Sequence, residues 1–285
     1  MIVAIVAPGN MGAAVARGLV DNGVTVLTTL EGRSAASCSR AQAAGMVAVA
    51  PQRLVAAEFV LSILPPGQAL AFAEQMVPWL AGGDARKPVF VDCNAVNPQT
   101  VRNIGAVIAQ ADVPFVDAAI IGSPPGPARP GPRFYASGPA ARMLEKLGPY
   151  GLDVRVLEGP LGAASALKMC YAGINKGIAG LASAMILAAD RSGATAALYQ
   201  EMSESLPGLL ETLRRQIPDM LPKAYRWVAE MQEIAAFNGD AGPAHDVFVG
   251  FSQLFGDIAR DVAEERRDSA VLKSFFAASG GLDES

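Results

Sequence analysis

The chain has 285 residues, of which 51% are hydrophobic and 18% are charged, and its formal net charge is −4. This length allows two modest domains, and the composition is typical of a folded globular protein. The acidic balance offers no broad positive field for a phosphate backbone, so we expect no nucleic-acid partner. Three widely spaced cysteines and one histidine predict neither a disulfide framework nor a metal site, and they favour a cytoplasmic protein.

The first part of the chain alternates between short β-branched runs and alanine-rich stretches, from residue 2 to about residue 159. This alternation predicts a parallel sheet covered by helices. Five runs are expected to form its main strands: Ile2–Ala7, Val24–Leu30, Phe59–Leu64, Val89–Asp92 and Phe115–Asp117. Two further runs are expected as short strands near the edge: Arg133–Ala136 and Val154–Leu157.

Beyond Gly162 the pattern becomes helical. Ala163–Asp190 contains no proline and predicts a helix about 40 Å long. The runs that follow carry no useful strand pattern and predict helices at Ala196–Leu206, Gly208–Gln216, Pro222–Ala236 and His245–Arg267. The predicted fold is therefore α/β: an N-terminal domain of the Rossmann type (1–160) and an all-α C-terminal domain (161–285), joined by a long interdomain helix.

The long helix also bears on possible partners. Its longest uncharged apolar segment, Gly177–Ala189, is shorter than the roughly 20 residues that a membrane span needs, so we expect no membrane partner. Its glycines, including Gly173, Gly177 and Gly180, would permit close helix packing within the chain or across a dimer. We expect a homodimer rather than a monomer.

A glycine motif, Ala7-Pro8-Gly9-Asn10-Met11-Gly12, follows the first predicted strand and opens a helix, as a dinucleotide fingerprint requires. Gly9 would let the backbone approach a pyrophosphate, and Gly12 would let helix and strand pack closely. Asn10 and Met11 would contribute chiefly backbone amides. An ordinary strand–turn–helix junction is the alternative, and the βαβ setting favours the nucleotide site.

The end of the second predicted strand reads Leu30-Glu31-Gly32-Arg33-Ser34. An acid at this place would bind the ribose hydroxyls of NAD, and Glu31 is available for that role. Arg33 and Ser34 could instead hold a 2′-phosphate by charge and hydroxyl. This pattern favours NADP, with NAD as the alternative.

Four separated segments occur in order: Gly9-Asn10-Met11-Gly12, Ile63-Leu64-Pro65, Val116-Asp117-Ala118, and Gly162 followed by Lys168. Together they resemble the β-hydroxyacid dehydrogenase family, relatives of 6-phosphogluconate dehydrogenase that include 3-hydroxyisobutyrate dehydrogenase. The resemblance covers residues 1 to about 180. The C-terminal third is similar to the small helical domain of an uncharacterised branch of that family.

The resemblance implies roles for individual residues. Lys168 matches the family's lysine that acts in proton transfer at the substrate hydroxyl. Its apolar neighbours indicate a buried stretch, whereas the alternative is an ordinary solvated lysine. Tyr171 and Asn175 lie on the same helical face and are further catalytic candidates. The remaining candidates are Leu64, Pro65 and Asn94 for cofactor, and Ile121, Gly122, Ser123 and Ser165 for substrate.

Several positions depart from the family pattern. Tyr171 and Ala172 stand where two asparagines are usual, and Asn94 and Ala95 stand where Ser and Thr are expected. The usual Ser-Gly-Gly element becomes Ile121-Gly122-Ser123, at the start of a proline-rich stretch. These changes predict a larger or less polar small-molecule substrate.

The resulting prediction is an enzyme that reversibly oxidises a hydroxyacid or related alcohol, with hydride transfer to NADP and Lys168 in proton transfer. Two alternatives stay open: an imine reductase on the same fold, and a non-catalytic binding protein that senses NADP(H).

Overall fold

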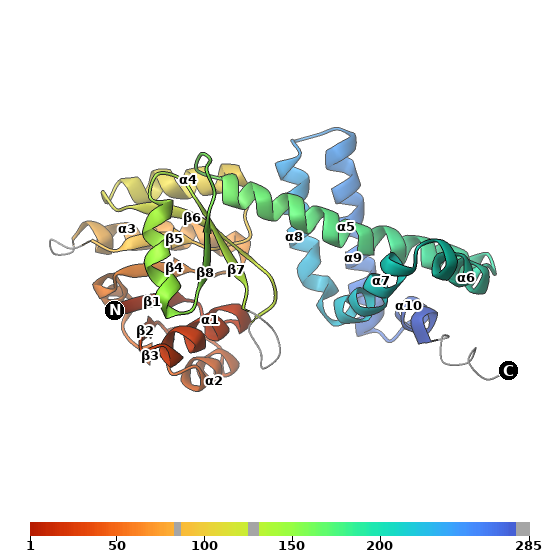
Figure 1. Ribbon diagram of the computed structural model, residues 1–285, viewed down its shortest axis with the longest axis horizontal. Helices are drawn as coiled ribbons and strands as arrows, with labels where there is room; N and C mark the ends of the chain where they lie inside the picture. The colour runs from red at the N-terminus through yellow and green to blue at the C-terminus, as the bar shows by residue number, and fades with distance from the viewer. Residues whose placement is uncertain (83–86, 125–130, 278–285) are drawn as a thin grey trace. The chain divides into compact units, whose positions relative to one another are not determined.

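The computed structural model describes residues 1–82, 87–124 and 131–277 (Figure 1). The chain forms two compact units, Met1–Met169 and Cys170–Ser285. The first is an α/β unit and the second is helical, which confirms the predicted fold class. The division falls within the long helix, later than the expected boundary near residue 160.

The described residues of the first unit form one eight-stranded sheet. Its order is β3 (Val47–Ala48), β2 (Thr25–Thr28), β1 (Ile2–Val6), β4 (Phe59–Ser62), β5 (Val89–Asp92), β6 (Phe115–Ile121), β7 (Arg133–Ser137) and β8 (Asp153–Val156). Neighbours from β3 to β6 are parallel. The chain reverses its winding between β1 and β4, and ligands of such sheets bind at the carboxyl ends of the strands at this switch point.

The far edge of the sheet differs from the expectation of a parallel sheet. β7 pairs antiparallel with β6, and β8 then runs parallel to β7. The physical reason lies in the connection, because residues 122–132 are too few to include a crossover helix. The expected edge position of the last two strands is confirmed, whereas the two-residue β3 was not predicted.

Helices cover both faces of the sheet. One hydrophobic cluster packs under α1 (Asn10–Asp21), α2 (Ala35–Ala43) and the 3-10 segment η3 (Ala141–Tyr150). The other packs under α3 (Ala69–Ala81), α4 (Pro98–Ala109) and η1 (Pro51–Ala56), and the short η2 (Pro66–Gln68) precedes α3. Within β1, Val3 and Ile5 belong to the first cluster and Ala4 and Val6 to the second, so the strand is buried on both sides as its unbroken apolar sequence predicts.

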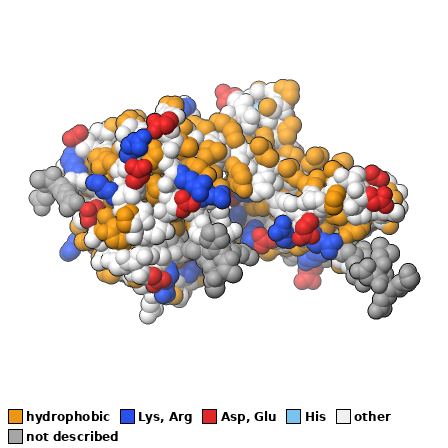
Figure 2. Space-filling view, viewed as in Figure 1, with side chains coloured by type: hydrophobic (Ala, Val, Ile, Leu, Met, Phe, Trp, Pro, Cys, Tyr) orange, Lys and Arg blue, Asp and Glu red, His pale blue; other side chains and the backbone are white. Residues whose placement is uncertain are grey.

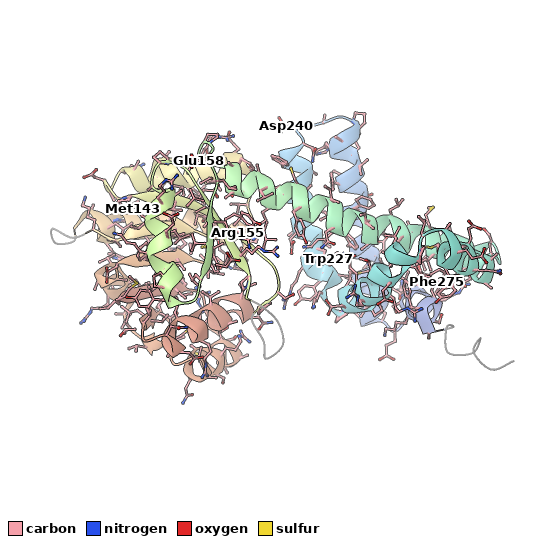
Figure 3. The ribbon with its side chains drawn as sticks, in the orientation of Figure 1. Met143, Arg155, Glu158, Trp227, Asp240 and Phe275 are labelled. Carbon is pink, nitrogen blue, oxygen red and sulfur yellow. The ribbon has the colours of Figure 1, made fainter. Side chains whose placement is uncertain are left out.

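The second unit is helical throughout its described residues. It contains most of α5 (Ala163–Arg191) together with α6 (Thr195–Ser205), α7 (Pro207–Met220), the short η4 (Leu221–Lys223), α8 (Ala224–Phe237), α9 (Pro243–Ala263) and α10 (Arg267–Ala277). Glycines of α5 admit phenylalanines of α9: a Cβ at Gly180 would lie 2.7 Å from the ring of Phe251. Trp227 of α8, labelled in Figure 3, packs edge-on against Phe255 with ring centroids 5.0 Å apart. The predicted close packing of the α5 glycines is therefore found within the chain.

The expected helix at His245–Arg267 is corrected to Pro243–Ala263, and the helix that follows it, α10, was not predicted. α9 ends at Ala263 and α10 begins at Arg267. Asp261 accounts for the break, because its carboxylate accepts hydrogen bonds from the amides of Asp268 (3.2 Å) and Ser269 (2.6 Å). The side chain caps the first turn of α10 and is buried there, instead of lying on a solvated face.

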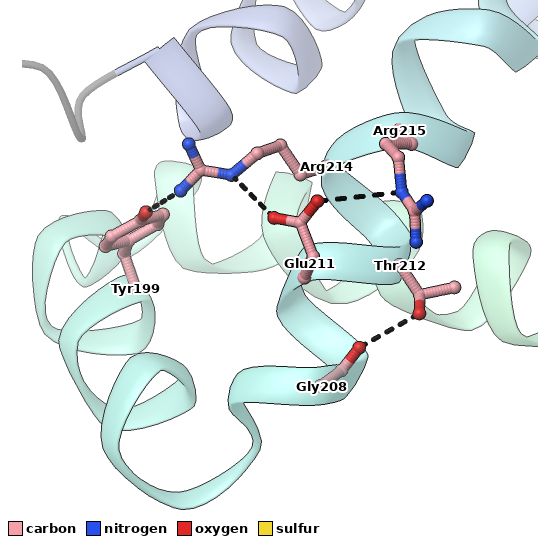
Figure 4. A network of polar contacts seen from close by, with 6 residues as sticks. All are labelled: Tyr199, Gly208, Glu211, Thr212, Arg214 and Arg215. Atoms are coloured by element: carbon pink, nitrogen blue, oxygen red, sulfur yellow. Dashed lines mark hydrogen bonds and ion pairs between the residues drawn. The ribbon is translucent and has the colours of Figure 1, made fainter.

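An arginine cluster links α6 and α7 (Figure 4). Arg214 donates to the Tyr199 hydroxyl at 2.5 Å and lies 3.7 Å from the Glu211 carboxylate, which also faces Arg215 at 3.6 Å. Exposed ion pairs of this kind typically contribute about 0–1 kcal/mol each. We therefore assign the cluster a modest structural role.

Among the described residues, α5 alone is long and apolar enough to cross a membrane by length and composition. One helix of this kind is weak support for a span, because the central helix of a folded unit passes the same test. The packing of its glycines against α9 is that of such a central helix.

Candidate active site

The turn between β1 and α1 is shaped to receive a phosphate group. Gly9 precedes the helix with no side-chain cap, and a Cβ added there would meet no atom within 4 Å. The amides of Asn10, Met11 and Gly12 lie in the first turn, where helix geometry leaves N–H groups without intrahelical partners. The first turn contains no acidic side chain. Open space, free amides and the positive end of the helix dipole together fit a dinucleotide pyrophosphate.

Gly12 has a different function in the same turn. A Cβ at this position would lie 2.1 Å from the backbone oxygen of Ala7. That oxygen also accepts a hydrogen bond from the amide of Gly9 at 2.9 Å, which holds the backbone of the turn in this position. The predicted close packing of helix and strand at Gly12 agrees with this geometry.

Replacing Gly12 with alanine is therefore expected to lower the free energy of unfolding by about 2 kcal/mol or more. Gly18, in the same helix, meets nothing within 4 Å, so Gly18→Ala is a matched control that should stabilise by about 0.5–1 kcal/mol. Thermal denaturation of the two variants measures the contrast. Equal stability of the two proteins would contradict the close approach at Gly12.

The turn after β2 supplies basic and hydroxyl groups. Gly32 has a φ of +69°, and the chain then places Arg33 half-buried and Ser34 exposed. The Arg33 Nε is buried and has no hydrogen-bond partner among residues 1–82, 87–124 and 131–277. Ser34 begins α2, and its hydroxyl accepts from the Ser37 amide at 3.3 Å. Glu31 is exposed.

Arg40 is a residue of this region that sequence reasoning missed. Its Nε donates to the backbone oxygen of Pro8 at 3.1 Å, and its guanidinium also donates to the Ser37 hydroxyl at 2.9 Å. The positive charge of Arg40, from α2, therefore lies against the glycine turn. The sequence at the end of β2 does not indicate Arg40, because the contact of Arg40 with the glycine turn depends on how α2 packs beside α1.

Asn94 ties together the turns that follow β4 and β5. Its side-chain oxygen accepts the Leu64 amide at 2.6 Å, and its amide nitrogen donates to Ser62 at 2.9 Å and to Asp92. Asn94 is buried, Leu64 is buried and Pro65 is exposed. The side chain of Asn94 is thus occupied in shaping the Leu64-Pro65 turn, which leaves its backbone for any contact with a cofactor.

A row of four polar residues crosses the sheet at the carboxyl ends of β4 and β5. Ser62, Asp92, Asp117 and Ser137 are paired in register on β4, β5, β6 and β7. Directly paired residues project from the same face of a sheet, so the row is continuous. All four are 0% exposed. Burying two carboxyl groups costs free energy unless hydrogen bonds or opposite charges compensate. The two carboxyl groups of the row therefore need such partners within the protein.

Asp117 anchors the start of α5. Its carboxylate accepts the Ser137 hydroxyl at 2.8 Å, the Ser165 hydroxyl at 2.7 Å and the Ser165 amide at 3.2 Å. The Ser137 oxygen in turn accepts the amide of Ala164 at 3.0 Å. These bonds cap the first turn of the helix from the sheet. Ser165, predicted to bind substrate, is buried with both polar groups bonded, so the structure does not support a direct substrate contact.

Lys168 lies one helical turn after this anchor. It is half-buried, and it interacts electrostatically with Asp92, Asp117 and Cys93. Burial lowers the pKa of Lys168 below its usual range, against the opposing pull of the two carboxyl groups. The thiol of Cys93 is buried, which raises its pKa well above the usual range and makes it a poor nucleophile. A lysine of this kind is poised to exchange protons.

The other predicted site residues differ in their surroundings. Tyr171 is exposed, and the backbone and side-chain oxygens of Asn175 accept from Gln216 at 2.9 and 3.3 Å. Ile121 is buried at the end of β6, Gly122 has a φ of +124°, and Ser123 is exposed. Residues 125–130 of the proline-rich stretch lie outside the described residues.

Comparison with known proteins identifies relatives of both parts of the chain. Residues 2–150 match the NAD binding domain of 6-phosphogluconate dehydrogenase. The chain belongs to the β-hydroxyacid dehydrogenase family. Residues 189–258 match a domain of unknown function (DUF1932), in the region where the sequence resembled an uncharacterised branch. A 3-hydroxyisobutyrate dehydrogenase of Pseudomonas aeruginosa is 29% identical over 247 residues, which span 84% of this chain and 78% of that protein.

Solved structures show the same family architecture. A conserved protein of unknown function, described as similar to 3-hydroxyacid dehydrogenases, is 27% identical with a TM-score of 0.70, covering 92% of this chain and 99% of that one. The 3-hydroxyisobutyrate dehydrogenase of Mycobacterium tuberculosis shares the fold at 19% identity, with a TM-score of 0.71 and coverage of 96% and 98%. An imine reductase of Streptomyces aurantiacus shares it at 18% identity, with a TM-score of 0.53 and coverage of 96% and 99%. The family member described here is a nicotinamide-dinucleotide-dependent, hydroxyacid dehydrogenase-like oxidoreductase.

Proposed function

We propose that this member of the β-hydroxyacid dehydrogenase family reversibly oxidises a hydroxy acid or related alcohol with NADP, and that Lys168 exchanges the hydroxyl proton. The observation that carries the proposal is the half-buried Lys168, which interacts electrostatically with the two buried carboxyl groups of the polar row. The row crosses the sheet at the carboxyl ends of β4 and β5, where ligands of such sheets bind. A surface lysine with an ordinary pKa would not support this role.

The proton and the hydride leave the substrate by separate routes. The O–H bond breaks as Lys168 Nζ forms a new N–H bond, while the C–H bond breaks and its electron pair leaves as hydride. The nicotinamide, when bound, supplies the hydride acceptor. A lysine can take the hydroxyl proton only as a neutral amine, and burial favours that form. We include Tyr171 and Asn175, further along α5, as candidates for orienting the substrate.

The proposed substrate is less polar than the family's usual small acids. Ile121 is buried where a serine is expected, and Ser165 is already bonded to Asp117. Ser123 is the exposed hydroxyl of this segment and is the group we propose for polar substrate contact. A panel of 3-hydroxy acids with increasingly large side chains, assayed by cofactor absorbance, tests this. A preference for the smallest acid would contradict it.

The preference for NADP rests on the turn after β2. We expect Arg33→Ala to weaken NADPH binding by roughly 10–100-fold, because a charge-assisted hydrogen bond contributes about 1.5–3 kcal/mol. NADH binding should change little. Fluorescence titration of both cofactors measures the ratio, with Arg53→Ala as a control that removes an exposed arginine elsewhere in the same unit. Equal losses for both cofactors would place Arg33 outside the 2′-phosphate site.

Imine reduction is the second candidate reaction. Tyr171 and Ala172 stand in place of the usual asparagines, which favours imine reduction as an alternative, and the imine reductase of Streptomyces aurantiacus shares this fold. Assays with cyclic imines beside the hydroxy acids separate the two reactions. Cofactor binding without turnover of either substrate class would favour an NADP(H)-sensing protein. The placement of Lys168 argues against that function.

We also propose a cytoplasmic homodimer. Helix α5 exposes an apolar stripe at helical spacing, in which Tyr171, Ile174, Leu181 and Met185 are 52–67% exposed. Hydrophobic side chains also appear along the surface of this helix in the space-filling view (Figure 2). A contiguous apolar face of this kind favours association. Light scattering coupled to gel filtration measures the mass: about 59 kDa, twice the 29.4 kDa of one chain, supports the dimer, and a monomer at micromolar concentration contradicts it.

A further inference from the structure

The polar row contains two buried carboxyl groups in paired register positions, Asp92 on β5 and Asp117 on β6. Both are 0% exposed. Two ionised carboxylates beside one lysine would leave an uncompensated negative charge in the interior. Such a pair is expected to retain one proton, as coupled carboxyl groups do when they share a site.

The hydrogen bonds show which of the two keeps the proton. Asp117 accepts three hydrogen bonds, from the Ser137 hydroxyl and from the hydroxyl and amide of Ser165. Asp92 accepts on Oδ1 from the side chain of Asn94, while its Oδ2 is buried without a partner among the described parts of the chain. Hydrogen bonds to a carboxylate favour the ionised form, and burial of an unpaired oxygen disfavours it. The hydrogen bonds therefore place the retained proton on Asp92.

The surroundings of Asp92 agree with this assignment. Burial, together with the negative charge of Asp117, raises its pKa to about 7 against the lowering effect of Asn94 and Lys168. The titratable groups that face it are Asp117 from β6, Lys168 from α5 and the thiol of Cys93 after β5. Ser62 and Asn94 are neutral. Lys168 is thus the one positive charge among these groups.

The state of Asp92 decides the state of Lys168. An ionised Asp92 would stabilise the Lys168 ammonium, which cannot accept a proton. A neutral Asp92 withdraws that stabilisation, and the remaining carboxylate, Asp117, is already satisfied by its hydrogen bonds to Ser137 and Ser165. We propose that Asp92 is a positioning residue that holds the proton of the buried carboxyl pair in the resting protein, so that Lys168 faces one ionised carboxylate instead of two. This inference rests on the proposed role of Lys168 as the proton acceptor.

A titration without substrate or cofactor tests the inference directly. The full chain is labelled with ¹³C at the aspartate carboxyl carbons, and its NMR spectrum is followed from pH 4 to pH 9. Asp92→Asn assigns the signal, and Asp92→Glu does so if the first variant fails to fold. We expect this signal to titrate about three pH units above an ordinary aspartate, and to titrate higher still in Lys168→Met, because a nearby positive charge is removed. Titration near pH 4, or an unchanged midpoint in Lys168→Met, would overturn the inference.

Once a substrate is known, the pH dependence of kcat/KM for alcohol oxidation gives a second readout. Asp92→Asn stays neutral above the pH at which Asp92 itself ionises, which leaves the Lys168 ammonium less stabilised there, so the acid limb should move to lower pH. A lower plateau with an unmoved limb would show a merely structural role for Asp92. Because the NMR result does not depend on turnover, failure of the proposed function and failure of this inference are distinguishable.

Discussion

Lys168→Met is expected to lower kcat/KM for alcohol oxidation by roughly 10²–10⁴-fold, the usual contribution of a positioned general base. Methionine preserves the length and apolar packing of the lysine stem but cannot take a proton. Cofactor affinity should change little, because the phosphate turn belongs to β1 and α1. Parallel measurement of steady-state rates and of cofactor binding separates these effects.

The pH dependence of the wild-type reaction shows in which direction the oxidation rate changes with pH. Burial lowers the pKa of Lys168, so the neutral amine is populated at lower pH than for an ordinary lysine. The rate of oxidation should be low below that pKa and should rise as the pH increases through it. Lys168→Met should lack this pH dependence. Lys146→Met, the same change at an exposed lysine, is the control. A variant as active as wild type would exclude Lys168 as the base.

Asp117→Asn is expected to destabilise the protein by about 2–4 kcal/mol. The amide keeps the shape of the carboxylate but has one acceptor oxygen in place of two, so at least one of the donors from Ser137 and Ser165 loses its partner. Because these bonds hold the first turn of α5, the change should also reduce kcat through misplacement of Lys168. Chemical denaturation measures the first effect and steady-state kinetics the second.

Asp112→Asn makes the same substitution at an exposed aspartate, whose only ion pair in the described residues is the 3.9 Å contact with Lys87. Its effect on stability should stay within about 0.5 kcal/mol. If Asp117→Asn were as stable and as active as this control, the carboxylate would have no anchoring role. A stable but inactive variant would instead indicate a direct part in the chemistry.

Local patterns explain why much of the fold was predictable. The predicted parallel strands are short runs rich in apolar residues, and the glycine motif directly follows one of them, so strand, turn and helix are determined by neighbouring residues. The direction of β7 was not predictable in this way, because it depends on whether residues 122–132 include a crossover. The end of α9 was missed for a similar reason, since the side chain of Asp261 bonds to residues seven and eight positions later.

The candidate site likewise combines residues that the sequence predicted with residues that it did not. Lys168 was found through the spacing of family motifs on one helix. The polar row was not, because Asp92 and Ser137 are each a single polar residue in an apolar strand, and a single sequence does not give the register that aligns them. Asn94 and Ser165 were predicted as site residues. Their side chains bond within the protein, and the sequence pattern contains no information about these hydrogen-bond partners. Arg40 became visible only through the packing of α2.

The most direct test of the central claim is titration of the full wild-type chain with NADPH and NADH, followed by fluorescence. We predict saturable binding of at least one cofactor below millimolar concentration, with NADPH bound more tightly. Binding of neither cofactor in that range would contradict the assignment of this chain as a nicotinamide-dependent oxidoreductase, whatever its fold.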